Sequence, residues 1–217
     1  MLGLFDSGKG GLNTVRFLKA SGLDLGLLYL IDRSNAPYGT KNEEIITKIA
    51  ENNIKTLTGM GAERVLIACC TASTVHHLLP QAEREASIPI IQAIASEARG
   101  RTKTRKIGVL ATHHTVSSHA FKSALSDCEV TEFSAGELVT RIDAGACDEN
   151  ITDADEKMLR GLLEPLITAK IDTLILGCTH FSSIRLTAGR ILEEHGITEL
   201  VDSARVGADI LTRLIRK

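Results

Sequence analysis

Two cysteines occupy similar places in the two halves of this chain. Cys69 follows the apolar run 65–68, and Cys178 follows the apolar run 174–176 and one glycine. A helical pattern comes after each cysteine, so we expect each at the carboxyl end of a buried parallel strand. Open α/β sheets bind ligands at this edge, and the helix dipole there favours a thiolate. Two such thiols predict an acid and a base that act on opposite sides of one substrate.

A zinc site and a plain packing role are the alternatives to acid–base chemistry at these cysteines. Residue types that bind zinc occur at Cys69, Cys70, Cys178 and His180. Adjacent cysteines are a poor ligand pair, because neighbouring side chains point apart on most backbones, and the sequence contains no Cys-x-x-Cys. Each cysteine could instead be a small buried hydrophobic residue, which is common. Two cysteines at matching strand ends fit a packing role less well than one would.

A glycine-rich loop follows the first expected strand. Residues 6–11 are Asp-Ser-Gly-Lys-Gly-Gly, and Asp32 ends the second expected strand. A dinucleotide-binding fingerprint would need its third glycine at position 13, which is Asn13. A Walker loop fails because no Gly-Lys-Ser/Thr ends the segment. The loop can hold an anion on its main-chain N–H groups, or it is a plain tight turn.

Composition limits the class of protein. The 217 residues are 43% hydrophobic and 24% charged, with a net charge of −2, as in soluble globular proteins. We therefore expect no nucleic acid and no membrane as partners, and no apolar run reaches the roughly 18 residues that span a bilayer. The N-terminal segment has no basic region before its apolar residues, so a signal peptide is not expected. The odd count of five cysteines, without framework spacing, then indicates reduced thiols in the cytoplasm.

Strand and helix patterns alternate, which predicts parallel βαβ units and an α/β fold. The expected strands are 2–5, 27–31, 65–68, 88–91, 107–111, 130–133, 174–176 and 199–201. The expected helices are 11–20, 40–57 (opening on a capping box at Thr40), 71–79, 116–125, 137–144, 154–169, 184–195 and 206–215.

The expected elements form two similar blocks. The basic stretch 99–106 separates them, and we interpret it as a solvated linker rather than a nucleic-acid patch, because it lacks aromatic residues. We expect two domains, each a mostly parallel sheet flanked by helices. The first comprises residues 1–95 with 206–217, and the second comprises residues 96–205.

Several segments together carry a family resemblance. Residues 5–12, Phe-Asp-Ser-Gly-Lys-Gly-Gly-Leu, are similar to Phe-Asp-Ser-Gly-x-Gly-Gly-Leu, and 37–39 are Pro-Tyr-Gly. Residues 68–73, Ala-Cys-Cys-Thr-Ala-Ser, are similar to Ala-Cys-Asn-Thr-Ala-Ser, and 177–181 are Gly-Cys-Thr-His-Phe. Further similar segments are 111–118 and 201–203. On these segments the chain resembles, nearly end to end, the cofactor-independent glutamate racemases of the aspartate/glutamate racemase superfamily.

The resemblance implies two α/β domains facing each other across a cleft, with one catalytic cysteine from each. The thiols would interconvert L- and D-glutamate without any cofactor or metal, supplying D-glutamate for peptidoglycan. By analogy with the family, Cys69 would deprotonate the D-enantiomer and Cys178 the L-enantiomer. The family pattern also selects Cys69 rather than Cys70 as the first catalytic cysteine. The implied catalytic set is Cys69 with Asp6 as its charged partner, Cys178 with His180 as its partner, and Asp143. The implied substrate-binding set is Ser7, Pro37, Tyr38, Gly39, Cys70, Thr71, Thr112 and Thr179.

The chain departs from the family at two of these positions. Cys70 stands where the family has asparagine, and Asp143 stands where it has glutamate. A thiol is a weaker hydrogen-bonding group than an amide. The departure at Cys70 keeps two alternatives open: a racemase for aspartate or another amino acid, and a catalytically weak ligand-binding homologue. The implied protein is a cytoplasmic homodimer whose partner is its small-molecule substrate.

Overall fold

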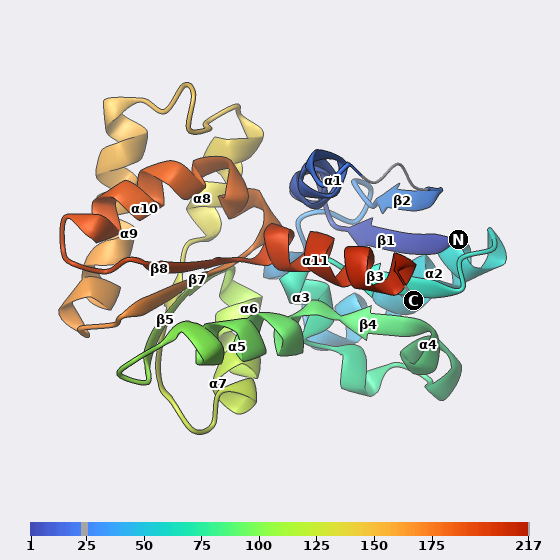
Figure 1. Cartoon of the computed structure of the whole chain (residues 1–217). Coiled ribbons are helices and arrows are strands. Elements are labelled where there is room, and N and C mark those ends of the chain that lie inside the picture. The colour runs from blue at the N-terminus through green and yellow to red at the C-terminus, as the bar shows by residue number, and fades with distance from the viewer. Residues whose placement is uncertain (23–25, 217) are drawn as a thin grey trace.

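The computed structural model describes residues 1–22 and 26–216, and these form two α/β units side by side (Figure 1). In this part of the chain each unit has a parallel four-stranded sheet, which confirms the predicted fold class. The first sheet contains β1 (Leu2–Asp6), β2 (Leu27–Ile31), β3 (Arg64–Ile67) and β4 (Ser87–Pro89). The second contains β5 (Lys106–Ala111), β6 (Glu129–Ser134), β7 (Thr173–Gly177) and β8 (Glu199–Asp202).

The two sheets have the same topology. Their strand orders are β2-β1-β3-β4 and β6-β5-β7-β8. The strands that precede the two cysteines, β3 and β7, therefore hold equivalent positions, each beside the first strand of its unit. Because all strands in a sheet are parallel, both cysteines lie at the carboxyl edge of their sheets.

Helices flank both sheets. The α-helices are α1 (Gly11–Ala20), α2 (Glu43–Gly59), α3 (Cys70–Ser73), α4 (Gln81–Ala86), α5 (Ile90–Arg101), α6 (His113–Ser117), α7 (Ala120–Ala124), α8 (Gly136–Asp143), α9 (Asp153–Thr168), α10 (Arg185–Glu193) and α11 (Ser203–Ile215). Short 3₁₀ helices are η1 (Tyr38–Thr40), η2 (His76–Leu78) and η3 (Thr179–Ile184). Among the described residues, no helix is both long enough and apolar enough to cross a membrane.

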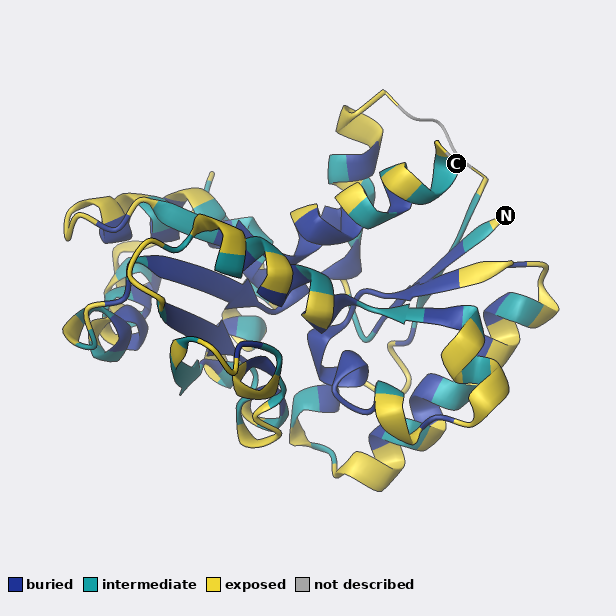
Figure 2. Cartoon of the chain, turned by 60° about the horizontal axis from the view of Figure 1, so that its bottom comes forward, coloured by how far each residue is buried: buried dark blue, intermediate teal, exposed yellow. Residues whose placement is uncertain are grey.

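Alternation along the strands divides the core into layers. In the first sheet, Leu4 and Leu66 pack with α1 and α11, whereas Phe5 and Ile67 pack with α2 on the other face. Figure 2 shows the result: most buried residues lie on the central strands and the inner faces of the helices, and exposed residues face outward on the helices.

The second sheet is layered in the same way. Leu174 and Leu176 on β7 pack in the cluster that includes α9 and α10. Ile175 points to the other face, where it packs with Ile90 and Ile94 of α5.

Two elements connect the units. α5 follows β4 directly and packs on the second sheet. α11 follows β8 directly and returns to the first unit, where Ala208 and Leu211 pack in one cluster with Leu18 of α1 (Figure 1). The predicted domain border after residue 95 falls within α5.

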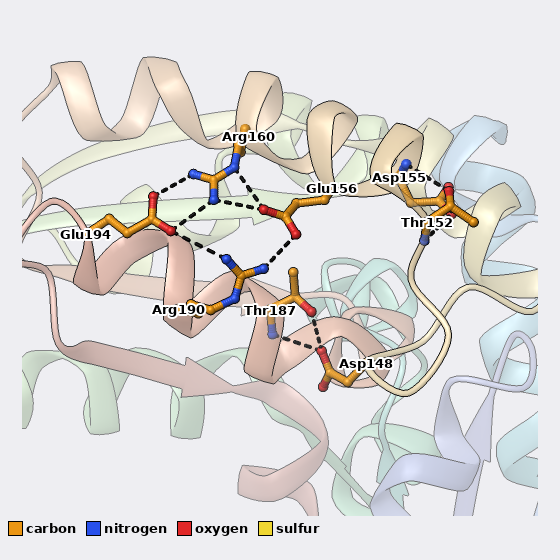
Figure 3. A network of polar contacts seen from close by, with 8 residues as sticks. All are labelled: Asp148, Thr152, Asp155, Glu156, Arg160, Thr187, Arg190 and Glu194. Atoms are coloured by element: carbon orange, nitrogen blue, oxygen red, sulfur yellow. Dashed lines mark hydrogen bonds and ion pairs between the residues drawn. The ribbon is translucent and has the colours of Figure 1, made fainter.

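A polar network joins the outer helices of the second unit (Figure 3). Arg160 of α9 donates to Glu156 and to Glu194, and Arg190 of α10 donates to Glu156 at 2.6 Å. Asp148 accepts from the main-chain N–H groups of residues 186 and 187, each at 2.9 Å, at the first turn of α10. These contacts hold α9 against α10.

Several predicted boundaries were wrong. The second helix begins at Glu43, because Asn42 rather than Thr40 is its cap and accepts from the N–H of Ile45 at 2.9 Å. The strand expected over 88–91 ends at Pro89, because Ile90 already begins α5.

Three further segments differ from the sequence prediction. The helix expected over 71–79 is broken into α3 and η2, and the helix expected over 116–125 is broken at His119, whose φ is 52°. The expected linker 99–106 is shorter, because residues 99–101 end α5 and Lys106 begins β5. The helices α4 and α5 were not predicted.

Candidate active site

A cavity of about 430 Å³ lies where the carboxyl edges of the two sheets meet. Both units line it, and it brings together every predicted site residue except Asp6, which is fully buried. The predicted residues that line it are Ser7, Pro37, Tyr38, Gly39, Cys69, Cys70, Thr71, Thr112, Asp143, Cys178, Thr179 and His180.

The cavity also has lining residues outside the predicted site set. These are Gly8, Ala36, Thr40, His113, Gly136, Val139, Thr140 and Gly177. Four residues of α8, at positions 136, 139, 140 and 143, line the cavity, and this spacing marks one face of a helix. The spacing relative to Asp143 was the available signal for Val139 and Thr140.

Cys69 lies between β3 and α3, where the backbone is still extended (φ −67°, ψ 115°). Its side chain is almost wholly buried, and its Sγ donates to Oγ of Ser7 at 3.5 Å. Burial raises the pKa of the Cys69 thiol to about 11, and the nearby carboxyl of Asp6 contributes to the rise. The resting form of this thiol at neutral pH is therefore protonated.

Cys178 follows β7 and stands at the head of a row of polar groups. Its Sγ lies 3.7 Å from Nδ1 of His180, and Nε2 of His180 lies 3.4 Å from Oδ1 of Asp143. That Nε2 is buried and has no hydrogen-bond partner within the described chain. Burial raises the pKa of the Cys178 thiol as well. The row gives the second thiol a neighbouring base, with a carboxylate behind it.

Asp6 connects the first strand to the turn after the second thiol. Its carboxyl accepts from the N–H of Gly8 at 3.1 Å and from the hydroxyl of Thr179 at 3.0 Å. Burial raises the pKa of Asp6, although the charge of His180 and these hydrogen bonds oppose the rise. The resemblance pairs Asp6 with Cys69, and that pairing stays a prediction, because both hydrogen bonds of the carboxyl go elsewhere.

Cys70 is the third thiol of the cavity. It begins α3, is 2% exposed, and packs in an apolar cluster with Ile90 and Ile91. Burial raises its pKa well above the ordinary value, and the nearby Cys178 and Cys69 add to the rise. This thiol therefore presents a neutral surface to the cavity.

Three threonine hydroxyls bridge the two units beside the cavity. Thr71 of α3 lies 2.8 Å from Thr112 and 3.1 Å from Thr115, measured between hydroxyl oxygens. The hydroxyls of Thr112 and Thr115 are 3.0 Å apart. Such a cluster can turn donors toward a carboxylate. Thr115 was not in the predicted binding set.

Tyr38 forms a wall of the cavity and is fixed from behind. Its hydroxyl donates to Asp32 at 2.6 Å and accepts from Asn53 at 3.0 Å. Burial would raise the pKa of Asp32, but hydrogen bonds from Tyr38, Asn35 and Asn53 outweigh it and lower the pKa. Asp32 thus anchors Tyr38, whereas in a dinucleotide-binding fold a carboxylate at this position would hold a ribose.

Metal coordination was the alternative role for the cysteines. Across residues 1–22 and 26–216, no group of three or more His, Cys, Asp or Glu side chains is arranged to hold a metal ion. A zinc site at Cys69, Cys70, Cys178 and His180 therefore has no support from their arrangement.

Comparisons of the sequence and of the structure with known proteins point to the same family. The sequence profile of the Asp/Glu/Hydantoin racemases matches residues 13–211. A glutamate racemase of Desulforudis audaxviator (strain MP104C) is 36% identical over 208 residues, covering 94% of this chain and 74% of that protein. A glutamate racemase isoform from Bacillus anthracis superposes with a TM-score of 0.88 at 26% identity, covering 100% of this chain and 81% of that one. The enzyme from Francisella tularensis subsp. tularensis SCHU S4, solved with D-glutamate, gives a TM-score of 0.85 at 28% identity, covering 99% of this chain and 80% of that one.

Proposed function

This chain belongs to the Asp/Glu/Hydantoin racemase family, as a relative of its glutamate racemases, and from that membership we propose that it interconverts L- and D-glutamate by proton transfer between two thiols. One observation carries the mechanism: Cys69 and Cys178 come from equivalent strand ends of the two sheets and line one cavity.

Inversion of an α-carbon needs a proton removed on one face and another added on the opposite face. In one direction the Cys178 thiolate takes the α-proton of L-glutamate, and the Cys69 thiol gives its proton to the other face. The products are D-glutamate, a Cys178 thiol and a Cys69 thiolate, so protons and charge balance. In the reverse direction the Cys69 thiolate takes the α-proton of D-glutamate, and the Cys178 thiol gives its proton to the other face.

The buried thiols need help to reach the reactive form, because burial keeps them protonated at neutral pH. His180 can take the proton of Cys178 across the 3.7 Å contact, and the carboxylate of Asp143 lies 3.4 Å from the other ring nitrogen. Asp6 holds the same turn through Thr179. This arrangement supports His180 and Asp143 as partners of the second thiol.

Hydroxyl and main-chain donors would hold the substrate carboxylates. Ser7, Thr71 and Thr112 supply hydroxyls from both units, and Thr179 follows the second thiol. Donors that face a carboxylate also stabilise the charge that develops when the α-proton leaves. Pro37, Tyr38 and Gly39 also line the cavity, and Gly39 lies against Thr112. The D-glutamate produced would serve peptidoglycan synthesis.

The test is α-hydrogen exchange and inversion of L- and D-glutamate in D₂O. Cys69→Ser and Cys178→Ser should each abolish inversion, since a hydroxyl is a far weaker acid than a thiol. Cys147→Ser is the matched control, because Cys147 lies in the loop between α8 and α9 and does not line the cavity. Near-normal inversion by Cys178→Ser would contradict the two-thiol mechanism.

A half-reaction shows whether a variant that loses inversion is still folded. Elimination of a leaving group from a β-substituted alanine needs one base only, so each serine variant should keep it for one enantiomer. A variant that loses inversion and keeps this elimination is folded, and its remaining thiol is active.

A second candidate function follows from Cys70. The thiol presents a weaker hydrogen-bonding group to the substrate than an amide would, which favours a different amino acid or ligand binding alone. The same exchange assay with a panel of L- and D-amino acids separates these cases. Inversion of another amino acid in preference to glutamate, or binding without exchange, would replace the proposed substrate or activity.

A further inference from the structure

A buried amide on α1 reaches across the boundary between the two units. Asn13 is 8% exposed, and its Nδ2 donates to the main-chain oxygen of Thr179 at 2.9 Å and to Oγ of Ser183 at 3.3 Å. Arg16 donates to Oδ1 of the same amide at 3.4 Å, which leaves the NH₂ group directed at the two acceptors. Both acceptors belong to η3, so one side chain holds this turn at its start and near its end.

The turn held by Asn13 carries the surroundings of the second thiol. η3 begins directly after Cys178, and its His180 has Nδ1 3.7 Å from the Cys178 Sγ. Gly10 packs against the same turn, because a Cβ built there would lie 2.6 Å from Nδ1 of His180. Asn13 is not among the described residues that line the cavity, so its effect on chemistry must pass through the turn.

We propose that Asn13 is a positioning residue that fixes Cys178 and His180 relative to the substrate. This inference rests on the proposed function, in which each thiol serves one enantiomer. Cys69 is held separately, at the end of β3 and beside Ser7. Loss of the Asn13 amide therefore disturbs proton transfer at Cys178 and leaves proton transfer at Cys69 nearly intact.

Isotope effects reveal this asymmetry where rates cannot. The two enantiomers are equally stable, so kcat/KM must fall by the same factor in both directions. For Asn13→Ala we expect a fall of about 10- to 100-fold, as for other misplaced reacting groups. The deuterium isotope effect on kcat/KM for α-deuterated L-glutamate should rise, because its proton leaves at Cys178. The isotope effect for α-deuterated D-glutamate should shrink toward one. Cys69 removes the deuteron in the first step, and the slower second step, proton donation by Cys178, then limits the rate.

A second measurement does not depend on racemisation. Iodoacetamide alkylation can be followed at each cysteine by mass spectrometry of its peptide. In Asn13→Ala, the alkylation rate of Cys178 should change several-fold while that of Cys69 stays as in the wild type. Thr14→Ala is the matched control: Thr14 is the next buried residue of α1 and packs near Gly207 of α11.

The possible outcomes distinguish a failure of the positioning role of Asn13 from a failure of the proposed racemase function. Asn13→Leu keeps the size of the side chain without its donors and replaces Asn13→Ala if that variant does not fold. Similar changes at both thiols, or wild-type isotope effects for both enantiomers, would overturn the positioning role. If the wild type neither exchanges nor inverts glutamate, the proposed function fails, and the alkylation comparison alone decides the role of Asn13.

Discussion

At the level of single residues, the cavity surrounds its three thiols differently. The hydroxyl of Ser7 lies beside Cys69, the imidazole of His180 lies beside Cys178, and apolar side chains pack around Cys70. Burial raises the pKa of all three, so position alone does not make a thiolate here. The neighbouring groups differ in whether they can accept a proton from the thiol. Of the three thiols, only Cys178 has a basic side chain, the imidazole of His180, beside it among the described contacts.

The raised pKa of Cys69 predicts how its reactivity depends on pH. With a pKa of about 11, its thiolate fraction should rise about tenfold for each pH unit between 7 and 9. Iodoacetamide alkylation of the peptide containing Cys69 should follow that slope. The same peptide in denaturant is the control, because an ordinary thiol with a pKa of about 8.5 levels off in this range. A plateau below pH 8 in the folded protein would show a lowered pKa and contradict the prediction.

At the level of elements, sequence patterns predicted strands better than helices. Buried parallel strands are short apolar runs with clear ends, so β2 was predicted at its observed bounds. Helix ends depend on caps and on tertiary contacts that a pattern does not record, as at Asn42 and at His119. Composition and spacing placed the two thiols at strand ends, but the family resemblance was needed to choose between Cys69 and Cys70.

The remaining parts of the site come from folding of distant segments. Asn13 and Thr179 are 166 residues apart in the chain, and no local spacing marks their contact. Thr115 and the α8 face are similar cases. The sequence therefore pointed to most of the residues that line the cavity and missed several that contact them.

The cap of α9 gives a prediction at this scale. The Thr152 hydroxyl accepts from the N–H of Asp155 at 3.2 Å, and the Asp155 carboxylate also accepts from Arg141 of α8 at 2.6 Å. Thr152→Ala should cost about 1 kcal/mol of unfolding free energy. In a chain of this size that lowers Tm by about 2–4 °C. Calorimetry would measure it, with Thr56→Ala on the exposed face of α2 as the control. An unchanged Tm in Thr152→Ala would show that this cap does not stabilise α9.

At the level of the whole molecule, one close contact between the two units is made by the loop that contains Gly10 and the turn η3. A Cβ at Gly10 would lie 2.7 Å from the main-chain nitrogen of His180 and would also collide with the Thr179 hydroxyl. Main-chain atoms cannot give way as a flexible side chain can, so these contacts set how near the first unit lies to the second thiol.

Gly10→Ala should therefore separate the units without unfolding either sheet. We expect kcat/KM to fall about 100-fold while circular dichroism stays unchanged. Gly161→Ala is the control, because Gly161 lies within α9 with open space around it. That variant should be active and more stable by up to about 1 kcal/mol. Wild-type activity in Gly10→Ala would show that the loop can shift freely.

The chain passes from one unit to the other through α5 and returns where β8 meets α11 (Figure 1). Two bodies hinged at two points can swing about the line through both hinges, but they resist sliding and twisting. Such a swing would change the separation of Cys69 and Cys178. An opening swing that admitted a substrate would also take the proposed acid and base out of alignment. An open enzyme would therefore be unable to protonate or deprotonate a bystander molecule, and the thiols would act as a pair only around a molecule they enclose.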